Sequence, residues 1–389
     1  MPEPLTSRWK EIAVGFLKVG ATAYGGPAIM GVMQAEFQER REWTSKTRFL
    51  EGLALVNVLP GATATQLGIF LGYVRAGWWG GLLAGLCFAA PAFVVMLALA
   101  FAYSAFGVSP LLRGALYGLG PVVVGIFVAA LYRLGTSALR SRTHGLIAIG
   151  AAAVALATSV GAAGILLLAG GVGLLLFHSR RIGALVLLAL AGALVLVPQL
   201  APTARLAAPL EPAPTLGSLA TLFATIGALT FGGGLSMIVL MQEHVVDRLH
   251  WLTPREFVDG LALGQLTPGP VLMLAAYVGY KLLGVGGALV AAAASFLPSF
   301  VLMLGLLPVF ERTRDLRWMK AVMQGLVPGV LGVMAVALVR LVPYAAPDLP
   351  AAGALILTAA LLVVWRLAPL KVMALGSIFG LLRTQSWVK

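Results

Sequence analysis

A Pro-Gly pair interrupts an apolar segment at two places in this chain, and these breaks constrain the fold more than any other feature. The first lies in residues 49–75, FLEGLALVNVLPGATATQLGIFLGYVR, and the second in residues 257–281, FVDGLALGQLTPGPVLMLAAYVGYK. Proline lacks an N–H and glycine loosens the backbone, so each pair ends a helix. Inside a bilayer, backbone freed in this way survives only where it is buried in protein or lines a cavity. The sequence therefore predicts two broken helices around which the rest of the chain is built.

The composition is that of a membrane protein. Hydrophobic residues make up 60% of the sequence and charged residues 11%, whereas soluble domains carry about 25% charge. Long apolar runs recur at residues 82–103, 114–132, 146–177, 182–197 and 351–365. Residues 1–10 contain no apolar core with a cleavage site, so we expect no removable signal peptide. The predicted fold class is an all-α polytopic membrane protein.

The charges and the reactive side chains argue against several other classes of protein. The net charge is +13, but most basic residues fall between the apolar runs. This placement is expected for positive-inside loops rather than for nucleic-acid binding. The single cysteine, Cys87, excludes a disulfide framework, and the scattered histidines give no metal-ligand spacing. Without a GxxxxGKS phosphate loop or a catalytic cluster, we expect neither an enzyme nor a cofactor.

The chain is a duplication with an offset of 207 or 208 residues. Residues 23–27, AYGGP, match residues 230–234, TFGGG. The other matching pairs are Glu36 with Glu243, Trp43 with Trp251, Pro60-Gly61 with Pro268-Gly269, Pro91 with Pro298, Arg113 with Lys320, and Arg133 with Arg340. Repeats with breaks in matching positions are typical of transporters built from two halves. We expect homologous repeats at residues 1–180 and 216–389, with a connecting span and a Pro/Ala-rich linker at 181–215.

Each half contains six expected spans, of which the last two are short and form either two crossings or a tight, partly inserted hairpin. They cover residues 11–36, 46–76 (broken), 78–104, 112–134, 145–159 and 161–178, and then 216–242, 254–283 (broken), 285–309, 319–342, 350–365 and 369–385. Together with the connecting span, the six spans of the first half make an odd number, so the second half enters from the opposite side. The basic clusters agree with this if both face the cytoplasm; they are Arg133, Arg140 and Arg142, and Arg312, Arg314, Arg317 and Lys320. We predict inverted repeats, a cytoplasmic N-terminus and an outside C-terminus.

Several motifs resemble those of the chromate ion transporter family, in its long two-domain form. They are Tyr24-Gly-Gly-Pro27, Glu39-Arg-Arg-x-Trp43, Asn57-x-x-Pro-Gly61 with Thr65-Gln66, Phe231-Gly-Gly-Gly234 and Thr267-Pro-Gly-Pro270. The resemblance implies export of chromate from the bacterial cytoplasm across the inner membrane. It also implies sulfate as a related oxyanion and the proton motive force as the source of energy. One departure is Ala62, where the family often has proline, whereas the second half keeps Pro270.

The two breaks are the expected oxyanion site. Chromate and sulfate are tetrahedral dianions, which helix N-termini, hydroxyls and amides can hold. The candidate residues are Asn57, Pro60, Gly61, Thr63, Thr65 and Gln66 in the first half, and Gln265, Thr267, Pro268, Gly269 and Pro270 in the second. The first half has more donors, because Val271, Leu272 and Met273 follow the second break. The alternative is that these polar groups only cap a kink.

Further candidates flank the breaks. Gly25-Gly26-Pro27 and Gly232-Gly233-Gly234 either break the first span of each half or allow close helix packing. Arg75 and Lys281 either draw an anion toward the breaks or anchor their helices at the membrane surface.

Glu51 and Asp259 are the candidate proton carriers, because each lies nine residues before its Pro-Gly pair in an apolar helix. Burial there favours the neutral form of a carboxylate, as a proton carrier requires. The alternative is a polar residue at the start of a helix. Glu36 and Glu243, which lie near Arg40 and Arg248, are interpreted as partners in interfacial ion pairs.

Two functions of different class follow from these features. The first is a secondary active transporter that exports chromate or a related oxyanion such as sulfate. The alternative is an anion channel with re-entrant selectivity loops. The expected partners are an inorganic oxyanion, protons and the lipid bilayer, with a homodimer as one allowed assembly and no nucleic acid.

Overall fold

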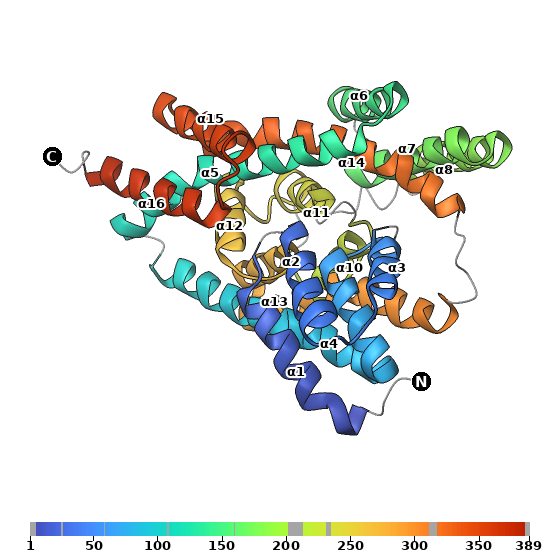
Figure 1. Ribbon diagram of the computed structural model, residues 1–389. Coiled ribbons are helices and arrows are strands. Elements are labelled where there is room, and N and C mark those ends of the chain that lie inside the picture. Colours follow the sequence, from blue (N-terminus) through green and yellow to red (C-terminus); the bar gives the residue numbers. More distant parts are fainter. Residues whose placement is uncertain are drawn as a thin grey trace. The chain divides into compact units, whose positions relative to one another are not determined.

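The computed structural model describes residues 5–24, 26–57, 59–106, 109–158, 160–200, 213–230, 235–310 and 317–385, and every element in them is helical (Figure 1). The first half contains α1 (Leu5–Thr22), α2 (Gly26–Met33), η1 (Gln34–Arg40), α3 (Lys46–Val56), α4 (Thr63–Phe106), α5 (Pro110–Ala138), α6 (Arg142–Ala157) and α7 (Ala162–Phe177). The connecting span is α8 (Arg180–Leu200). The second half contains α10 (Leu216–Ala228), α11 (Leu235–Met241), η3 (Gln242–Arg248), α12 (Pro254–Leu266), η4 (Val271–Met273), α13 (Leu274–Phe310), α14 (Arg317–Ala345), α15 (Leu349–Val363) and α16 (Pro369–Gln385). Among the described helices, α4, α5, α13 and α14 are long and apolar enough to cross a membrane.

The chain forms two compact units, and each unit contains segments from both halves of the sequence. Unit 1 comprises Met1–Arg113, Pro214–Met237 and Gly260–Arg314. Unit 2 comprises Gly114–Ala213, Ile238–Asp259 and Asp315–Lys389. Equivalent helices of the repeat therefore occur in the same unit, α4 with α13 in unit 1 and α5 with α14 in unit 2.

In unit 1, the first Pro-Gly break is the tip of a helical hairpin. A Cβ atom at Gly52 in α3 would overlap the ring of Phe70 in α4. The guanidinium carbon of Arg48 lies 5.7 Å from the centre of the same ring. If the helix continued in one direction past the break, positions 52 and 70 would be about 27 Å apart at about 1.5 Å per residue. The chain therefore turns back on itself at the break.

The second break has the same form. A Cβ atom at Gly260 in α12 would overlap the ring of Tyr277 in α13. The segments 46–76 and 254–283 are thus hairpins, which corrects the prediction that each forms one interrupted span. The reason is that the residues between the two helical pieces, which include a glycine at positive φ in each half, reverse the chain instead of kinking it.

A second reversal divides α4 into two antiparallel helices. Ala76 and Gly77 have non-helical backbone angles, with φ = 65° at Gly77. A Cβ atom at Gly72 would overlap the Cβ atom of Ala84, although these positions lie about 18 Å apart in a continuous helix. α13 reverses in the same way next to Gly284, where φ is 62°. The expected span boundaries at residues 76 and 283 are therefore confirmed.

The second parts of α4 and α13 pack against each other in opposite directions. A Cβ atom at Gly81 would lie 3.1 Å from Cδ2 of Leu304, and one at Gly85 would lie 2.6 Å from Cζ of Phe300. Residue numbers thus rise along one helix as they fall along the other. These equivalent helices of the repeat are therefore antiparallel.

The first helix of the chain also breaks and turns back within unit 1. Residues 23–25 separate α1 from α2, so of the two alternatives for the Gly-Gly-Pro motif, the structure has a break in this half. Phe16 of α1 stacks on Phe37 of η1 with ring centroids 4.4 Å apart, and Phe37 stacks on Trp43 at 4.6 Å. This aromatic column holds the two helical pieces side by side.

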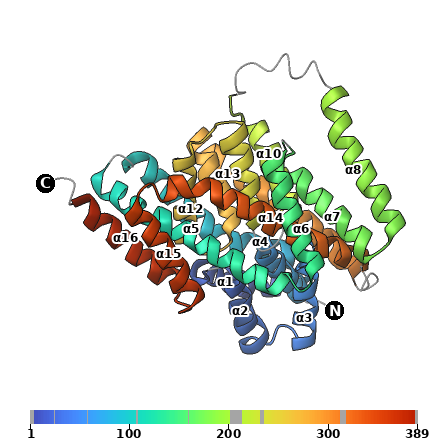
Figure 2. The same ribbon diagram turned by 90° about the horizontal axis from the view of Figure 1, so that it is seen from above.

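In unit 2, the two halves exchange helices. α5 of the first half packs on α15 and α16 of the second half, whereas α14 of the second half packs on α6 and α7 of the first (Figures 1 and 2). Small residues allow the close approach. A Cβ atom at Gly118 would overlap the carbonyl oxygen of Gly376, and one at Gly325 would overlap that of Ala169. Gly118 corresponds to Gly325 and Ala169 to Gly376, each at an offset of 207 residues, so the two contacts are equivalent.

Two arginines repeat the same exchange. Arg133 in α5 donates to the carbonyl oxygen of Leu362 in α15 at 2.7 Å. Its counterpart, Arg340 in α14, donates to the carbonyl oxygen of Ala155 in α6 at 3.3 Å. Each half of the sequence therefore covers a helix that belongs to the other half.

Two π-helices correct one pairing within the repeat. η1 and η3 are both seven residues long and begin 208 residues apart. After them, the N–H of Arg41 donates to the carbonyl oxygen of Glu36, and the N–H of Leu249 donates to that of His244. His244 is thus the structural counterpart of Glu36, and the predicted pairing of Glu36 with Glu243 is wrong by one residue. One residue turns a side chain by about 100° around a regular helix, so these two carboxylates do not occupy equivalent positions.

Candidate functional site

Backbone and hydroxyl groups from the second half of the chain hold the first break. Gly61 has φ = 122°, a conformation that favours glycine. Its N–H donates to the carbonyl oxygen of Thr230, at the end of α10, at 2.7 Å. The N–H of Ala62 donates to Oγ of Ser299 in α13 at 2.8 Å. The tip of this hairpin is therefore bonded at two consecutive N–H groups.

The second break is held by the same backbone contact with the halves exchanged. Gly269 has φ = 92°, and its N–H donates to the carbonyl oxygen of Ala23, at the end of α1, at 2.9 Å. Ala23 and Thr230 are equivalent positions of the repeat. Each Pro-Gly break therefore meets the end of the first helix of the opposite half.

The two breaks differ in the group that faces them. Next to Gly61 stands the hydroxyl of Ser299, whereas next to Gly269 stands the methyl group of Ala92, the counterpart of Ser299. The N–H of Ala62 donates to this hydroxyl, whereas its counterpart Pro270 has no N–H to donate. The difference between Ala62 and Pro270 thus coincides with an additional hydrogen bond at the first break.

α4 begins directly after the first break, and its first turn is buried and polar. The N–H groups of the first residues of a helix have no acceptor within that helix. Thr65 and Gln66 are completely buried, and Thr63 is 8% exposed. Nε2 of Gln66 donates to the carbonyl oxygen of Pro60 at 2.6 Å. In the described part of the chain, Oγ1 of Thr65 and Oε1 of Gln66 have no hydrogen-bond partner, which points to a bound water or ligand.

The second break offers fewer donors. Gln265 is half-buried in the last turn of α12. Thr267 is buried, but its hydroxyl already donates to the carbonyl oxygen of Leu263 at 2.9 Å. Pro268 and Pro270 are buried, and apolar residues form the short helix η4 that follows. The side chains that follow the second break therefore supply packing rather than hydrogen bonds.

Other candidates near the breaks have local partners or lie outside the described residues. Asn57 is the exposed C-cap of α3, and its Nδ2 donates to the carbonyl oxygen of Leu53 at 2.8 Å. Gly26 and Pro27 are the first residues of α2. The residues outside the described ranges are Gly25, Gly232, Gly233 and Gly234.

Arg75 and Lys281 both lie beside aromatic rings. Arg75 forms an ion pair with Glu11 at 3.1 Å and stands over the ring of Trp43. Nζ of Lys281 lies 5.4 Å from the ring centre of Tyr103. For Arg75, these contacts tie the end of the hairpin to α1.

Glu51 and Asp259 each lie one helical turn from an arginine. Glu51 pairs with Arg48 at 3.0 Å, and its side chain is about one-third exposed. Asp259 pairs with Arg255 at 3.3 Å, and its side chain is 8% exposed. The two candidate proton carriers thus share a partner type and differ in burial. The ion pairs expected for Glu36 with Arg40 and for Glu243 with Arg248 are present.

Sequence reasoning missed Ser299 as a residue of the site. A signal was available, because Ser299 follows Pro298 and its counterpart Ala92 follows Pro91 in the matching apolar span. A hydroxyl gained at one position of a repeat, opposite a proline lost at another, indicates a contact between the two. That contact requires α13 of the second half to reach the break of the first, which only the tertiary structure reveals.

Comparisons with known proteins agree over nearly the whole chain. A family model described as "Chromate transporter" matches residues 10–175 and again residues 217–381. The chromate transport protein of Cupriavidus metallidurans is 32% identical over 355 residues, which cover 91% of this chain and 87% of the relative. The chromate transport protein of Pseudomonas aeruginosa is 33% identical over 362 residues, covering 90% and 84%. An uncharacterized transporter of Methanocaldococcus jannaschii is 27% identical over 85% and 83% of the two chains. No solved structure matches.

Proposed function

Because this chain belongs to the chromate transporter family, we propose that it exports chromate, or a related oxyanion such as sulfate, across the bacterial inner membrane. It acts as a secondary transporter and holds the oxyanion at the N-terminus of α4. The observation that carries this proposal is the pair of fully buried side chains, Thr65 and Gln66, at the start of that helix. Each has a polar atom with no hydrogen-bond partner among the residues that the structure describes.

The chemistry of this helix start suits a tetrahedral anion. The N–H groups of the first turn and the hydroxyl of Thr65 donate to the oxyanion, and the helix dipole favours negative charge there. Oε1 of Gln66 accepts from a protonated oxygen of the anion or from a water. Neutral donors also suit a carrier, because a transported ion must bind and then leave.

The hairpin lengths support a site near the middle of the membrane. α3 and residues 63–75 are about 16 and 20 Å long, at about 1.5 Å per residue, and the hydrocarbon layer is about 30 Å thick. Trp78 and Trp79 follow the turn at Gly77 and are 43% and 62% exposed, as expected for an aromatic belt at the membrane surface. With that turn at the surface, the Pro-Gly tip reaches about half to two-thirds of the way across, near the depth where transporters commonly bind substrates.

The inverted arrangement of the halves is supported by the antiparallel packing of α4 and α13. If these helices cross the bilayer, an approximate two-fold axis perpendicular to both of them would relate the halves and would lie in the membrane plane. The two hairpins at the start of each half return to their side of origin. Residues 78–106, α5, α6, α7 and α8 then make five crossings before the second half begins on the opposite side. This keeps the N-terminus in the cytoplasm, the C-terminus outside and both basic clusters in the cytoplasm.

The membrane potential supplies energy for export of a dianion. Moving one charge through 100 mV is worth about 2.3 kcal/mol, so two charges leaving a negative interior gain about 4.6 kcal/mol. Coupling to protons would add to this, with Glu51 and Asp259 as the carriers. Asp259 is the stronger candidate, because its side chain is more deeply buried.

An anion channel is the second candidate, and the hairpins favour it specifically. Two hairpins with their tips in the membrane also describe re-entrant loops that line a pore. A carrier saturates and concentrates its substrate, whereas a channel passes unitary currents and cannot concentrate an ion against its electrochemical gradient.

The test is uptake of radiolabelled chromate and sulfate into everted membrane vesicles, with and without a pH gradient. We expect saturable uptake of at least one of the two anions. Thr65→Val removes the hydroxyl but keeps the shape, and a lost hydrogen bond to a charged group costs about 1.5–3 kcal/mol. The KM should therefore rise by about one to two decades.

Thr267→Val is the matched control, because its hydroxyl is already bonded to its own helix; the KM should change little. Equal KM values for Thr65→Val and the wild type would show that the substrate does not bind at the start of α4. Single-channel currents in planar bilayers, together with uptake that does not saturate, would establish the channel instead.

A further inference from the structure

Unit 2 contains a cavity of ≈ 260 Å³ that is separate in sequence from both Pro-Gly breaks. It is lined by the loop before α7, by η3 and by α14, and four charged residues line it: Glu243, Asp247, Arg248 and Arg340. In the same measure of volume, one water needs about 10–15 Å³. The cavity therefore has room for a small hydrated ion.

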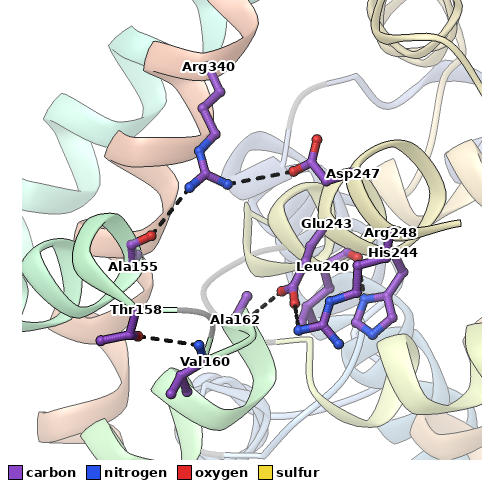
Figure 3. Close-up of polar contacts among 10 residues, drawn as sticks. All are labelled: Ala155, Thr158, Val160, Ala162, Leu240, Glu243, His244, Asp247, Arg248 and Arg340. Carbon is purple, nitrogen blue, oxygen red and sulfur yellow. Dashed lines mark hydrogen bonds and ion pairs between the residues drawn. The ribbon is translucent and has the colours of Figure 1, made fainter. Parts of the chain in front are cut away.

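The carboxylate of Glu243 occupies the N-terminus of α7 inside this cavity (Figure 3). Its Oε2 accepts from the N–H of Ala162, the first residue of the helix, at 2.5 Å. Its Oε1 lies 2.6 Å from Nη2 of Arg248. A Cβ atom at Gly161 would overlap this carboxylate, so glycine at that position allows the approach. A helix N-terminus with an adjacent arginine is an anion-binding arrangement, and here the protein's own carboxylate fills it.

A second observation points to a ligand other than Glu243. Gln242 lines the same cavity and is 4% exposed, and its Oε1 has no hydrogen-bond partner within the described residues. An acceptor buried in this way points to a water or to a protonated oxygen of a bound group. The guanidinium groups of Arg248 and Arg340 can still bind a ligand. Nη1 of Arg340 lies 3.7 Å from Oδ2 of Asp247, a long distance for an ion pair, and both arginine side chains are about half exposed.

We propose that this cavity binds a tetrahedral oxyanion group, which replaces the carboxylate of Glu243 at the start of α7. The group accepts hydrogen bonds from the N–H of Ala162 and from Arg248 and Arg340. The donors come from three elements that meet at the cavity, so the site differs from the helix start of α4. The proposal rests on the proposed function only for the choice of sulfate and chromate as probes.

The charges around Glu243 predict how it acts on such a ligand. From its own helix, Asp247 and Arg248 face the cavity, while Nδ1 of His244 lies 2.9 Å from the carbonyl oxygen of Leu240. From α14 comes Arg340. The carboxylates of Glu243 and Asp247 together balance the charges of the two arginines, so a dianion binds well only when the carboxylate of Glu243 is displaced. Glu243 is therefore an internal competitor of the anion.

The test is a sulfate titration of the purified full-length protein in phosphatidylcholine nanodiscs at constant ionic strength, followed by calorimetry and repeated with chromate. Glu243→Gln removes the competing charge, and the affinity for sulfate should rise about tenfold. Arg248→Gln and Arg340→Gln should each lower it about tenfold. Glu36→Gln, the removal of a carboxylate in the corresponding π-helix, is the control and should leave the affinity unchanged.

A lipid phosphate offers the same tetrahedral oxyanion chemistry, so the titration is repeated in nanodiscs that contain phosphatidylglycerol. Weaker sulfate binding in these discs, with the loss abolished by Arg248→Gln, identifies a lipid headgroup as an occupant of the site. Unchanged binding identifies the free anion.

Thr65→Val separates this proposal from the transport site. Sulfate affinity that responds to Glu243→Gln and Arg340→Gln in a Thr65→Val background supports the cavity site. If Glu243→Gln does not fold, Arg340→Gln still provides the test. Binding that is lost in Thr65→Val but unaffected by Arg248→Gln and Arg340→Gln overturns the cavity site and leaves the proposed function standing.

Discussion

The two Pro-Gly breaks have one backbone design and two different sets of side chains. Each is the tip of a helical hairpin with a glycine at positive φ, and each glycine N–H is bonded to the first helix of the opposite half. At the first break, an N–H at Ala62 meets a hydroxyl at Ser299. At the second break, Pro270 lacks the N–H and Ala92 lacks the hydroxyl. Donor and acceptor are present together or absent together.

The features that the two breaks share are structural, and the side chains in which they differ are the ones that bear on ligand binding. The glycines and their backbone contacts are needed at both breaks, because they hold the chain reversal in place. The polar side chains Thr65 and Gln66 occur after the first break only, where η4 of the second half has valine, leucine and methionine. We infer that the first break binds the ligand and that the second supports it. The following predictions test that comparison, from the largest expected effect to the smallest.

Separating the halves should abolish the fold, because each break is held by the opposite half and each half covers a helix of the other. Expressed alone, residues 1–200 or 213–389 should give no monodisperse peak in size-exclusion chromatography. Expressed together, they should copurify and restore transport. A monodisperse half that is stable alone would contradict the exchange of helices.

Alanine at the break glycines should destabilise both hairpins. At Gly61 and Gly269 a side chain is strained at positive φ and also overlaps or crowds its neighbour, Ser299 or Ala92. We expect each substitution to lower the free energy of unfolding by about 2–5 kcal/mol, measured by thermal unfolding in detergent.

Gly284→Ala is the matched control, because φ there is also positive but no atom of the described residues lies within 4 Å of the added Cβ. Its cost should be about 1–2 kcal/mol. Equal losses at Gly284 and Gly61 would show that backbone strain alone, and not the contact at the tip, limits stability.

The pair Ala62 and Ser299 should behave as one interaction. Ala62→Pro removes the donor and Ser299→Ala removes the acceptor, and each leaves a buried group unpaired at a cost of about 1–3 kcal/mol. The double variant, which copies the second break, should be no less stable than the worse single variant. Losses that add fully in the unfolding measurement would mean that the hydrogen bond does not couple the two positions.

The carboxylates should change coupling with little effect on stability. Glu51→Gln and Asp259→Asn copy the protonated form, so each variant should exchange anion down its gradient but should not accumulate it with a proton gradient. We expect the larger effect at Asp259, because its side chain is the more buried. Accumulation that survives both substitutions would assign the driving force to the membrane potential alone.

Much of the fold was predictable from local signals. Apolar runs, Pro-Gly pairs and the repeat predicted the helices, the breaks and the boundaries at residues 76 and 283, because helix-ending residues act on their own neighbours. The register between Glu36 and Glu243 was not predictable in this way. The two π-helices begin 208 residues apart, so the structural register here is 208. By residue type alone, matching the two glutamates at an offset of 207 fits the sequence as well.

The site could be predicted in part, for a related reason. Thr65 and Gln66 stood out as polar residues next to a break, so composition along the chain was enough to find them. Ser299 and the cavity around Glu243 could not be found this way, because their partners are 237 and 81 residues distant in sequence. No pattern within one short segment reports a contact at such a separation, and for Ser299 the available signal was a difference between matching positions of the two halves.

The sequence by itself determined that this chain is a duplicated helical membrane protein with a break in each half, since apolar length and proline chemistry are properties of short segments. Only the tertiary structure decided that each break is a hairpin, that each is held by the opposite half, and that Glu243 lies at the start of α7. The physical reason is that buried N–H groups must find acceptors, and a long chain offers many. Close packing of small residues from the two halves decides which of these acceptors each N–H group reaches.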